Sequence, residues 1–266
     1  MAQIKAVFFD IDGTLVPIGS GGIPESTKEA LRLLRAKGIK VFISSGRHPA
    51  WINNLEGETF DGYVTVNGAL CLAADGKTVI YKRVIDHIDI ERLVGFVHEH
   101  GDSMPFVVVT PSDEPYTTGK GGTFENVAAM LRIPKVSVRP VEDALGTDVI
   151  QLIVFSPEDV VAASGLYERI LPDCAGMTWC GDFADIVPRG SDKSVGIDRM
   201  LEYYGIDLSE TMAFGDGGND IGMLRHMAVG VAMGNASDEV KAVADYVTDD
   251  VNADGVMKAL KELHVL

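Results

Sequence analysis

Long hydrophobic runs are absent from this sequence of 266 residues. None approaches the roughly 20 consecutive apolar residues that a transmembrane helix needs, so neither a membrane span nor a membrane partner is expected. The first residues, MAQIKAVFFD, lack the pattern of a secretory signal peptide, which predicts a cytoplasmic protein. Cysteine is scarce, and Cys71, Cys174 and Cys180 form no C-x-x-C pair. We therefore expect reduced thiols.

Positive charge is also in short supply. The chain has 23 Lys and Arg against 39 Asp and Glu, a formal net charge of −16. Nucleic acid and anionic membranes repel such a chain, so neither is expected as a partner, and an anionic ligand would need local cations. The six histidines are scattered, which argues against a zinc site. No pattern indicates an obligate protein partner.

The sequence does contain a hydrophobic fraction of 46%, arranged in alternating strand and helix patterns. Apolar runs at 6–9 and 39–45 flank an amphipathic helix. This is a β-α-β unit of normal size, which implies parallel strands. The spacing of Ser26 and Glu29 predicts a capping box at the start of the helix.

The pattern changes from about Val84 and returns to the earlier alternation late in the chain. The intervening segment contains two sets of strands and helices, which predicts a separate small domain. We therefore predict an α/β fold with a doubly wound, Rossmann-like parallel-sheet core. The core should comprise 1–83 and 184–266, and an inserted α+β domain should span 84–183.

Acidic residues follow the first predicted core strand. Asp10 and Asp12 come directly after the apolar run at 6–9 and before Gly13 and Thr14. Two carboxylates beside a buried strand are costly unless a cation or a dense set of donors balances them. Because open parallel sheets bind ligands at the carboxyl ends of their strands, this stretch is either a site or a simple turn.

A second acidic stretch favours the site. Asp216 and Asp220 bracket two glycines and Asn219, again directly after a predicted strand. Two acidic strand ends in separate halves of a parallel sheet suggest convergence on one cation. Oxygen ligands of this kind suit Mg²⁺, which keeps several waters and adds a substrate phosphate oxygen. The sequence therefore predicts Mg²⁺ as the cofactor.

Four short motifs occur in order along the chain. They are D-I-D-G-T-L at 10–15, S-S-G-R at 44–47, Lys193 and G-D-G-G-N-D at 215–220. Together they resemble the four motifs of the haloacid dehalogenase (HAD) superfamily of phosphatases. The large insert between the second and third motifs resembles the Cof-type subfamily, whose cap domain is of the C2B kind. The similarity extends to the final G-V-A-M-G-N-A, and bacterial members that act on sugar phosphates are the most similar.

The resemblance implies catalytic roles for three residues. Asp10 would be the nucleophile that forms an aspartyl-phosphate. Asp12 would protonate the leaving oxygen and then act as the base on the water that hydrolyses this intermediate. Lys193 would balance the negative charge of the carboxylates and the phosphate.

The resemblance also implies a set of ligands for the metal and the phosphate. The metal ligands would be Asp10, Asp12 through its backbone carbonyl, Asp216 and Asp220. Asp220 would bind either directly or through a water. The phosphoryl group would be held by Ser45, Gly46, Gly13 and Asn219, with backbone amides among the donors. Asn219 would orient either the phosphate or Lys193.

Two residues near these motifs are open to two interpretations each. Arg47 would touch the substrate or form a salt bridge with an acidic neighbour. Asn67, which precedes Gly68, would reach the active site or belong to a plain turn. For Asn67 we favour a turn with a minor role in the site.

Three functions fit these patterns. The favoured one is a Mg²⁺-dependent phosphatase of small phosphorylated metabolites, with hexose or pentose phosphates favoured by the resemblance. A phosphomutase of the same superfamily would need cations in the inserted domain for a second phosphate. However, residues 84–183 carry six Lys and Arg against sixteen Asp and Glu, a net charge of −10. A phospho-accepting regulatory protein is the third, but Asp12, placed to activate water, favours turnover over storage.

Overall fold

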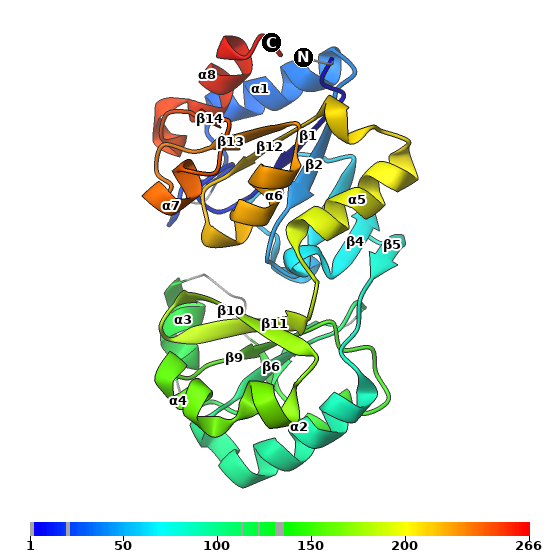
Figure 1. Ribbon diagram of the computed structural model, residues 1–266, viewed down its shortest axis with the longest axis vertical. Helices are drawn as coiled ribbons and strands as arrows, with labels where there is room; N and C mark the ends of the chain where they lie inside the picture. The colour runs from blue at the N-terminus through cyan, green and yellow to red at the C-terminus, as the bar shows by residue number, and fades with distance from the viewer. Residues whose placement is uncertain (1–2, 20–21, 113, 122, 131–135) are drawn as a thin grey trace. The chain divides into compact units, whose positions relative to one another are not determined.

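The computed structural model describes residues 3–19, 22–112, 114–121, 123–130 and 136–266. The chain forms two compact units (Figure 1). The first comprises Met1–Tyr81 and Asp192–Leu266, and the second comprises Lys82–Ser191. The second unit is therefore an insertion into the first, as the sequence pattern suggests.

An eight-stranded sheet lies at the centre of the first unit, in the order β14-β13-β12-β1-β2-β3-β4-β5. Neighbours from β14 to β3 are parallel, and β4 is antiparallel to β3. The strands are β1 (Ala6–Phe9), β2 (Lys40–Ser44), β3 (Gly62–Thr65), β4 (Leu70–Ala73), β5 (Val79–Lys82), β12 (Thr211–Gly215), β13 (Val229–Ala232) and β14 (Tyr246–Val247). Because β1 is central, all four of its residues are buried.

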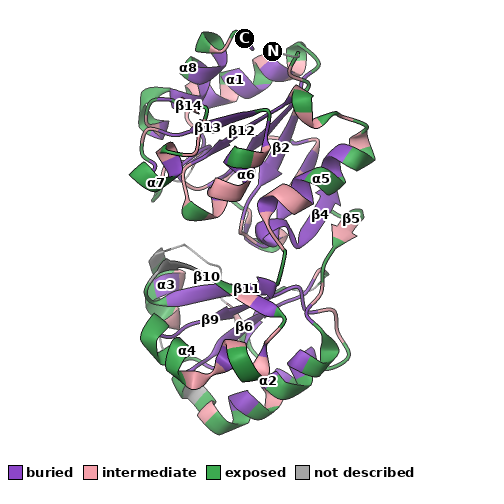
Figure 2. Ribbon diagram, in the orientation of Figure 1, coloured by how far each residue is buried: buried purple, intermediate pink, exposed green. Residues whose placement is uncertain are grey.

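Helices pack on both faces of this sheet. They are α1 (Glu25–Ala36), α5 (Lys193–Tyr204), α6 (Ile221–His226), α7 (Asp238–Lys241) and α8 (Gly255–Glu262). Phe9 and Phe214 stack in the cluster that contains residues of α1 and α8. Phe8 and Phe42 stack in the cluster that contains residues of α5, α6 and α7. Figure 2 shows the buried central strands between these layers, and the predicted doubly wound core is confirmed.

The second unit contains a six-stranded, mostly antiparallel sheet in the order β10-β11-β9-β6-β7-β8. Its strands are β6 (Phe106–Val109), β7 (Tyr116–Thr117), β8 (Ser137–Val138), β9 (Gln151–Val154), β10 (Cys174–Cys180) and β11 (Phe183–Pro188). Its helices are α2 (His87–His100), α3 (Phe124–Met130) and α4 (Glu158–Ser164). Side chains of the sheet form one buried cluster with α2 and α4. This is the predicted α+β insertion.

The end of the insertion lies later in the structure than the sequence boundary at 183/184. β11 begins at Phe183 and pairs with both β9 and β10, so it belongs to the second sheet. The chain returns to the first unit at Asp192. A mostly apolar segment such as Phe183–Pro188 predicts a strand, but the sheet that it joins depends also on its pairing with β9, which is not adjacent in the sequence.

The predicted capping box at the start of α1 is wrong. The helix begins at Glu25 and Pro24 is its N-cap, with no side-chain cap. Ser26 lies in the first turn, and its buried Oγ has no hydrogen-bond partner within the described residues. Proline at the helix start has a fixed φ, here −58°, which suits entry into a helix without a hydroxyl cap. In the same described part of the chain, no helix is both long and apolar enough to cross a membrane.

Candidate active site

Asp10 lies at the carboxyl end of β1, beside the end of β12. Its backbone N–H donates to the carbonyl of Phe214 at 3.0 Å, which fixes the first residue after the strand. The carboxylate is buried. Burial raises the pKa of Asp10 well above its usual value, Lys193 opposes this rise, and the neighbouring carboxylates Asp220, Asp216 and Asp12 add to it. The environment therefore penalises the negative charge of Asp10 unless further cations are present.

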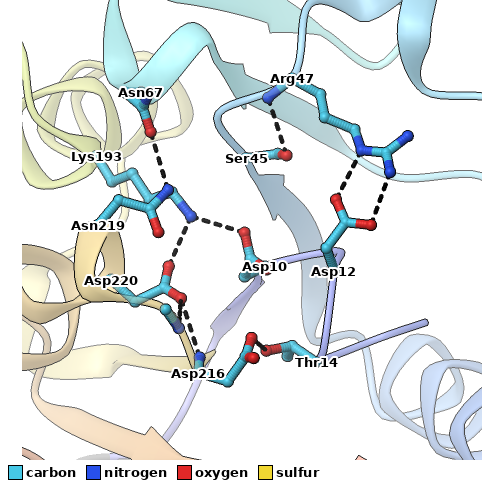
Figure 3. Close-up of polar contacts among 11 residues, drawn as sticks. Asp10, Asp12, Thr14, Ser45, Arg47, Asn67, Lys193, Asp216, Asn219 and Asp220 are labelled. Atoms are coloured by element: carbon cyan, nitrogen blue, oxygen red, sulfur yellow. Dashed lines mark hydrogen bonds and ion pairs between the residues drawn. The ribbon is translucent and has the colours of Figure 1, made fainter. Parts of the chain in front are cut away.

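Lys193 is the buried cation of the site. It begins α5, whose N-cap Asp192 accepts a hydrogen bond from the backbone N–H of Ser194. Its Nζ lies 2.7 Å from Oδ1 of Asp10 and 2.6 Å from Oδ1 of Asp220 (Figure 3). Burial alone would lower the pKa of Lys193, but the two carboxylates more than offset it and raise the pKa. Lys193 thus stays charged and links the acidic residues of both halves of the sheet.

Asp220 organises the loop that follows β12. Its Oδ2 accepts hydrogen bonds from the backbone N–H groups of Asp216 and Gly217, both at 2.9 Å. Its Oδ1 accepts from Lys193. Three protein donors thus occupy most of the roughly four lone-pair positions of this carboxylate, so the geometry favours Asp220 as a support for the loop and for Lys193. Contact with a metal through a water fits this arrangement better than direct ligation does.

Asp216 has one protein donor on each carboxylate oxygen. Oδ1 accepts from Oγ1 of Thr14 at 3.0 Å, and Oδ2 accepts from Nδ2 of Asn235 at 3.1 Å. Burial, followed by the charge of Asp220, raises the pKa of Asp216 to about 7. A carboxylate has about four lone-pair positions, so Asp216 keeps acceptor capacity for a cation.

These acidic side chains fit a divalent cation. One carboxylate oxygen from each of Asp10, Asp216 and Asp220 lies within 4.8 Å of the others. The donor set is entirely oxygen, as Mg²⁺ prefers. The raised pKa values of Asp10 and Asp216 show that their negative charges are under-compensated by Lys193 alone. A bound Mg²⁺ would supply the missing positive charge.

Asp12 is turned toward Arg47 instead of joining this carboxylate group. Nε and Nη2 of Arg47 lie 2.6 and 2.7 Å from the two carboxylate oxygens of Asp12. Nη1 of Arg47 also donates to the carbonyl of Trp51 at 3.0 Å. The salt-bridge interpretation of Arg47 is therefore confirmed, and its fork holds Asp12 in one orientation. The side chain of Asp12 remains separate from the three clustered carboxylates.

The residues expected to hold phosphate lie at neighbouring strand ends, but their donors differ in availability. Ser45 is buried, and its Oγ accepts from the backbone N–H of Arg47 at 3.2 Å. Gly46 follows it and is half-buried. The N–H of Gly13 donates to the carbonyl of Val16 at 2.8 Å, so this amide is already engaged. The importance of Gly13 is instead steric, because a Cβ there would lie 2.0 Å from Oδ2 of Asp216.

Asn67 reaches the site more directly than a turn residue with a minor role would. Its Oδ1 accepts from Nδ2 of Asn219 at 3.0 Å, as Figure 3 shows. The turn places Val66, Asn67 and Gly68 at φ angles of 53°, 50° and 87°. A left-handed backbone is unusual for a β-branched residue such as Val66, and strain of this kind clusters at functional sites. The turn thus ties the end of β3 to the loop of Asp216 and Asp220.

Sequence reasoning missed Thr14 and Asn235 as members of the site. Both donate to Asp216 across more than 18 residues of sequence. The G-N-A stretch at 234–236 is the one sequence signal for Asn235, and it assigns no role to this residue. A hydrogen bond between loops after different strands leaves no spacing pattern in the sequence.

The chain is similar to proteins of known family and known structure. A family model described as haloacid dehalogenase-like hydrolase matches residues 7–260. YkrA of Bacillus subtilis, which is named as a proposed phosphatase, is 32% identical to this chain over 98% of both chains. The structure of BT4131, described as a HAD subclass IIB sugar phosphatase, has a TM-score of 0.85 and 39% identity, covering 98% of this chain and 100% of that one. The phosphatase BT1666 from Bacteroides thetaiotaomicron has a TM-score of 0.88 and 32% identity, covering 99% and 96%.

Proposed function

Because this chain belongs to the haloacid dehalogenase-like hydrolases, we propose that it is a Mg²⁺-dependent phosphatase acting through an aspartyl-phosphate on Asp10. Its activity class, phosphoric monoester hydrolysis, follows from the family and from its phosphatase relatives. The substrates we propose are small phosphorylated metabolites, with hexose or pentose phosphates first because BT4131 is described as a sugar phosphatase.

In the first half of the reaction we assign the attack on phosphorus to the free carboxylate oxygen of Asp10. The bond from phosphorus to the leaving oxygen breaks, and that oxygen takes a proton from Asp12. In the second half, Asp12 removes a proton from water. The water oxygen then attacks phosphorus, which releases inorganic phosphate and restores the carboxylate of Asp10. Asp12 regains its proton, so the cycle closes.

Charge compensation makes the attack of one anion on another feasible. Lys193 contacts Asp10 at 2.7 Å and can stabilise charge that develops on the phosphoryl oxygens. Ser45, the amide of Gly46 and Asn219 are proposed as phosphate contacts. Mg²⁺, held by Asp10, the Asp12 carbonyl and Asp216, with Asp220 in support, would supply positive charge when bound.

The second unit is proposed as the cap domain of the family. Its 84–183 segment has a net charge of −10, which disfavours ligands with a second phosphate. Small monophosphates fit this charge better than bisphosphates or long phosphate chains. A cap that excludes bulk water would also protect the aspartyl-phosphate until Asp12 acts.

The observation that carries the proposal is the buried bridge of Lys193 between Asp10 and Asp220, beside the separately held Asp12. The test measures phosphate release from sugar phosphates, nucleotides and cofactor phosphates. Each substrate is assayed with Mg²⁺, with EDTA, and with the Asp10→Asn variant. We expect release that needs Mg²⁺ and that is abolished in the variant.

The ranking of substrates in this assay identifies the class of metabolite. A requirement for a bisphosphate activator would instead indicate a phosphomutase. If the wild-type protein releases no phosphate from any compound and stays labelled at Asp10, the hydrolase proposal fails in favour of a phospho-accepting regulatory protein.

A further inference from the structure

Asn235 lies beside the loop that carries Asp216, although no catalytic motif includes it. It follows β13, which is the parallel neighbour of β12 with Ala232 opposite Gly215. The N–H of Met233 continues this pairing by donating to the carbonyl of Gly215 at 3.0 Å. The loops after the two strands therefore emerge side by side at the carboxyl edge of the sheet.

The side-chain amide of Asn235 makes three hydrogen bonds to three separate segments. Its Nδ2 donates to the carbonyl of Gly13 at 2.9 Å and to Oδ2 of Asp216 at 3.1 Å. Its Oδ1 accepts from the backbone N–H of Val251 at 3.1 Å. A flipped amide would place oxygen against two oxygens and nitrogen against a donor, so only one orientation satisfies the network.

Asn235 is exposed, but hydrogen bonds of the backbone on either side of it limit its movement. The N–H of Gly234 donates to the carbonyl of Asp249 at 3.0 Å. A Cβ on Gly234 would lie 2.6 Å from the backbone nitrogen of Asp250. The N–H of Ala236 closes a turn onto the carbonyl of Met233 at 3.0 Å. Asn235 thus projects from a well-anchored turn.

The two donors to Asp216 act on different oxygens. Thr14 binds Oδ1 and Asn235 binds Oδ2, so together they set the plane of the carboxylate. Asn235 also holds the carbonyl of Gly13, whose backbone approaches Oδ2 of Asp216 closely. The orientation of Asp216 is therefore coupled to the loop that carries Asp10 and Asp12.

From these contacts we infer that Asn235 is a positioning residue that orients Asp216, together with Thr14, for binding of the divalent cation. The inference rests on the proposed Mg²⁺-dependent function. Partners that orient metal-binding carboxylates typically contribute about 10- to 100-fold to metal affinity. Asn235 touches neither the substrate nor the reacting atoms in this assignment, and it acts through Asp216.

The test measures binding of Mn²⁺ alone, a cation that also prefers oxygen ligands, by electron paramagnetic resonance of the free ion. Asn235→Ala and Thr14→Val should each weaken binding about 10- to 100-fold. Thr14→Ser, which keeps the hydroxyl donor, should bind within about two-fold of the wild type. Asn252→Ala is the matched control, because Asn252 bonds to Asp250 in the adjacent turn and should also bind within about two-fold.

Two further readouts separate positioning from a purely structural role. Thermal unfolding in EDTA reports whether each variant is folded. The Mg²⁺ dependence of phosphate release should move to higher concentrations in Asn235→Ala, with most of kcat recovered at saturation. If Asn235→Ala does not fold, Asn235→Ser, which is too short to reach Asp216, replaces it with the same expected loss of affinity.

A folded Asn235 variant that binds Mn²⁺ as tightly as the wild type overturns the inference, even if it is less stable. In that case normal hydrolysis by the wild type leaves the proposed function intact. A wild-type protein that binds no divalent cation overturns both.

Discussion

At the scale of single residues, the ion pair between Arg47 and Asp12 sets the orientation of the Asp12 carboxylate. The bidentate contact directs both oxygens of Asp12 toward the guanidinium, and the Trp51 carbonyl anchors the third nitrogen of Arg47. Such a fork fixes orientation as well as charge. Asp12 must turn from this ion pair to reach the leaving oxygen, so we expect Arg47 to matter chiefly for the steps in which Asp12 moves a proton.

Replacing Arg47 tests this expectation through the leaving group of the substrate. Arg47→Ala should lower kcat/KM for a sugar phosphate about 10²-fold, because its leaving alkoxide needs a proton from a correctly placed acid. The loss should be much smaller for p-nitrophenyl phosphate, whose leaving group departs without one. Steady-state kinetics with both substrates provide the measurement.

Two variants control for general effects of removing an arginine. Arg47→Lys keeps the charge but loses the fork, so it should behave more like Arg47→Ala than like the wild type. Arg35→Ala removes a half-buried arginine of α1 that pairs with Glu58 and not with a residue of the site, and it should leave both activities unchanged. Equal losses for the two substrates in Arg47→Ala would refute a role through Asp12.

At the scale of secondary-structure elements, the site is built from loops that follow adjacent parallel strands. The loop after β1 carries Asp10 and Asp12, the loop after β2 carries Ser45, and the loop after β12 carries Asp216. Each loop is bonded to a neighbour, so a change in one loop displaces groups in another. The glycine of the first loop is the position where this coupling is most direct.

Gly13→Ala should abolish most phosphatase activity and metal binding. Gly13 has a φ of 87°, and an added Cβ would lie 2.0 Å from Oδ2 of Asp216. The substitution therefore displaces a proposed metal ligand in addition to straining the backbone. Phosphate release and Mn²⁺ binding by the purified variant provide the measurements, with a loss of about 10²-fold expected in activity.

Gly38→Ala is the matched control for backbone strain. Gly38 has a φ of 75°, but an added Cβ would meet nothing within 4 Å. It should cost about 1 kcal/mol of stability and leave activity unchanged. If Gly13→Ala loses stability to the same extent but keeps its activity, the close approach to Asp216 has no functional importance.

At the scale of the whole molecule, the excess of negative charge affects the stability of the first unit. The net charge is −16, and the proposed site adds buried carboxylates that repel one another. Without a divalent cation, this unit should become less stable as those carboxylates ionise. Stability, pH and metal binding are therefore linked.

The metal-free protein should lose stability as the pH rises from about 4 to about 7. The pKa of Asp216 is raised to about 7 in the folded state, above its ordinary value of 3.8. A raised carboxyl pKa means that the folded state binds more protons between those values. The contribution of Asp216 to the stability of the folded state is therefore complete below pH 3.8, and it is lost as the pH rises to about 7.

Mg²⁺ should reverse this trend, raising the unfolding temperature more at about pH 8 than at about pH 5, because protons compete for the ligand oxygens at low pH. Thermal unfolding with Mg²⁺ and with EDTA at each pH provides the measurement. Asp216→Asn should reduce both the pH dependence in EDTA and the stabilisation by Mg²⁺. A Mg²⁺ effect that is larger at the acidic pH would contradict the assignment of Asp216.

The sequence alone determined the parallel core, the insertion and the order of the motifs, because each depends on local patterns. Apolar runs ending in Asp10 and in the stretch from Gly215 identify buried strands, and parallel strands bring their carboxyl ends to one edge. Lys193 could be picked out because it stands in motif order before an amphipathic helix.

Only the tertiary structure decided which groups are partners. It assigned Arg47 to Asp12 and joined β11 to the inserted sheet. It also brought Asn235 to Asp216. These contacts join side chains and strands that are remote in sequence, and their geometry follows from the packing of loops at the sheet edge, for which no local periodicity exists.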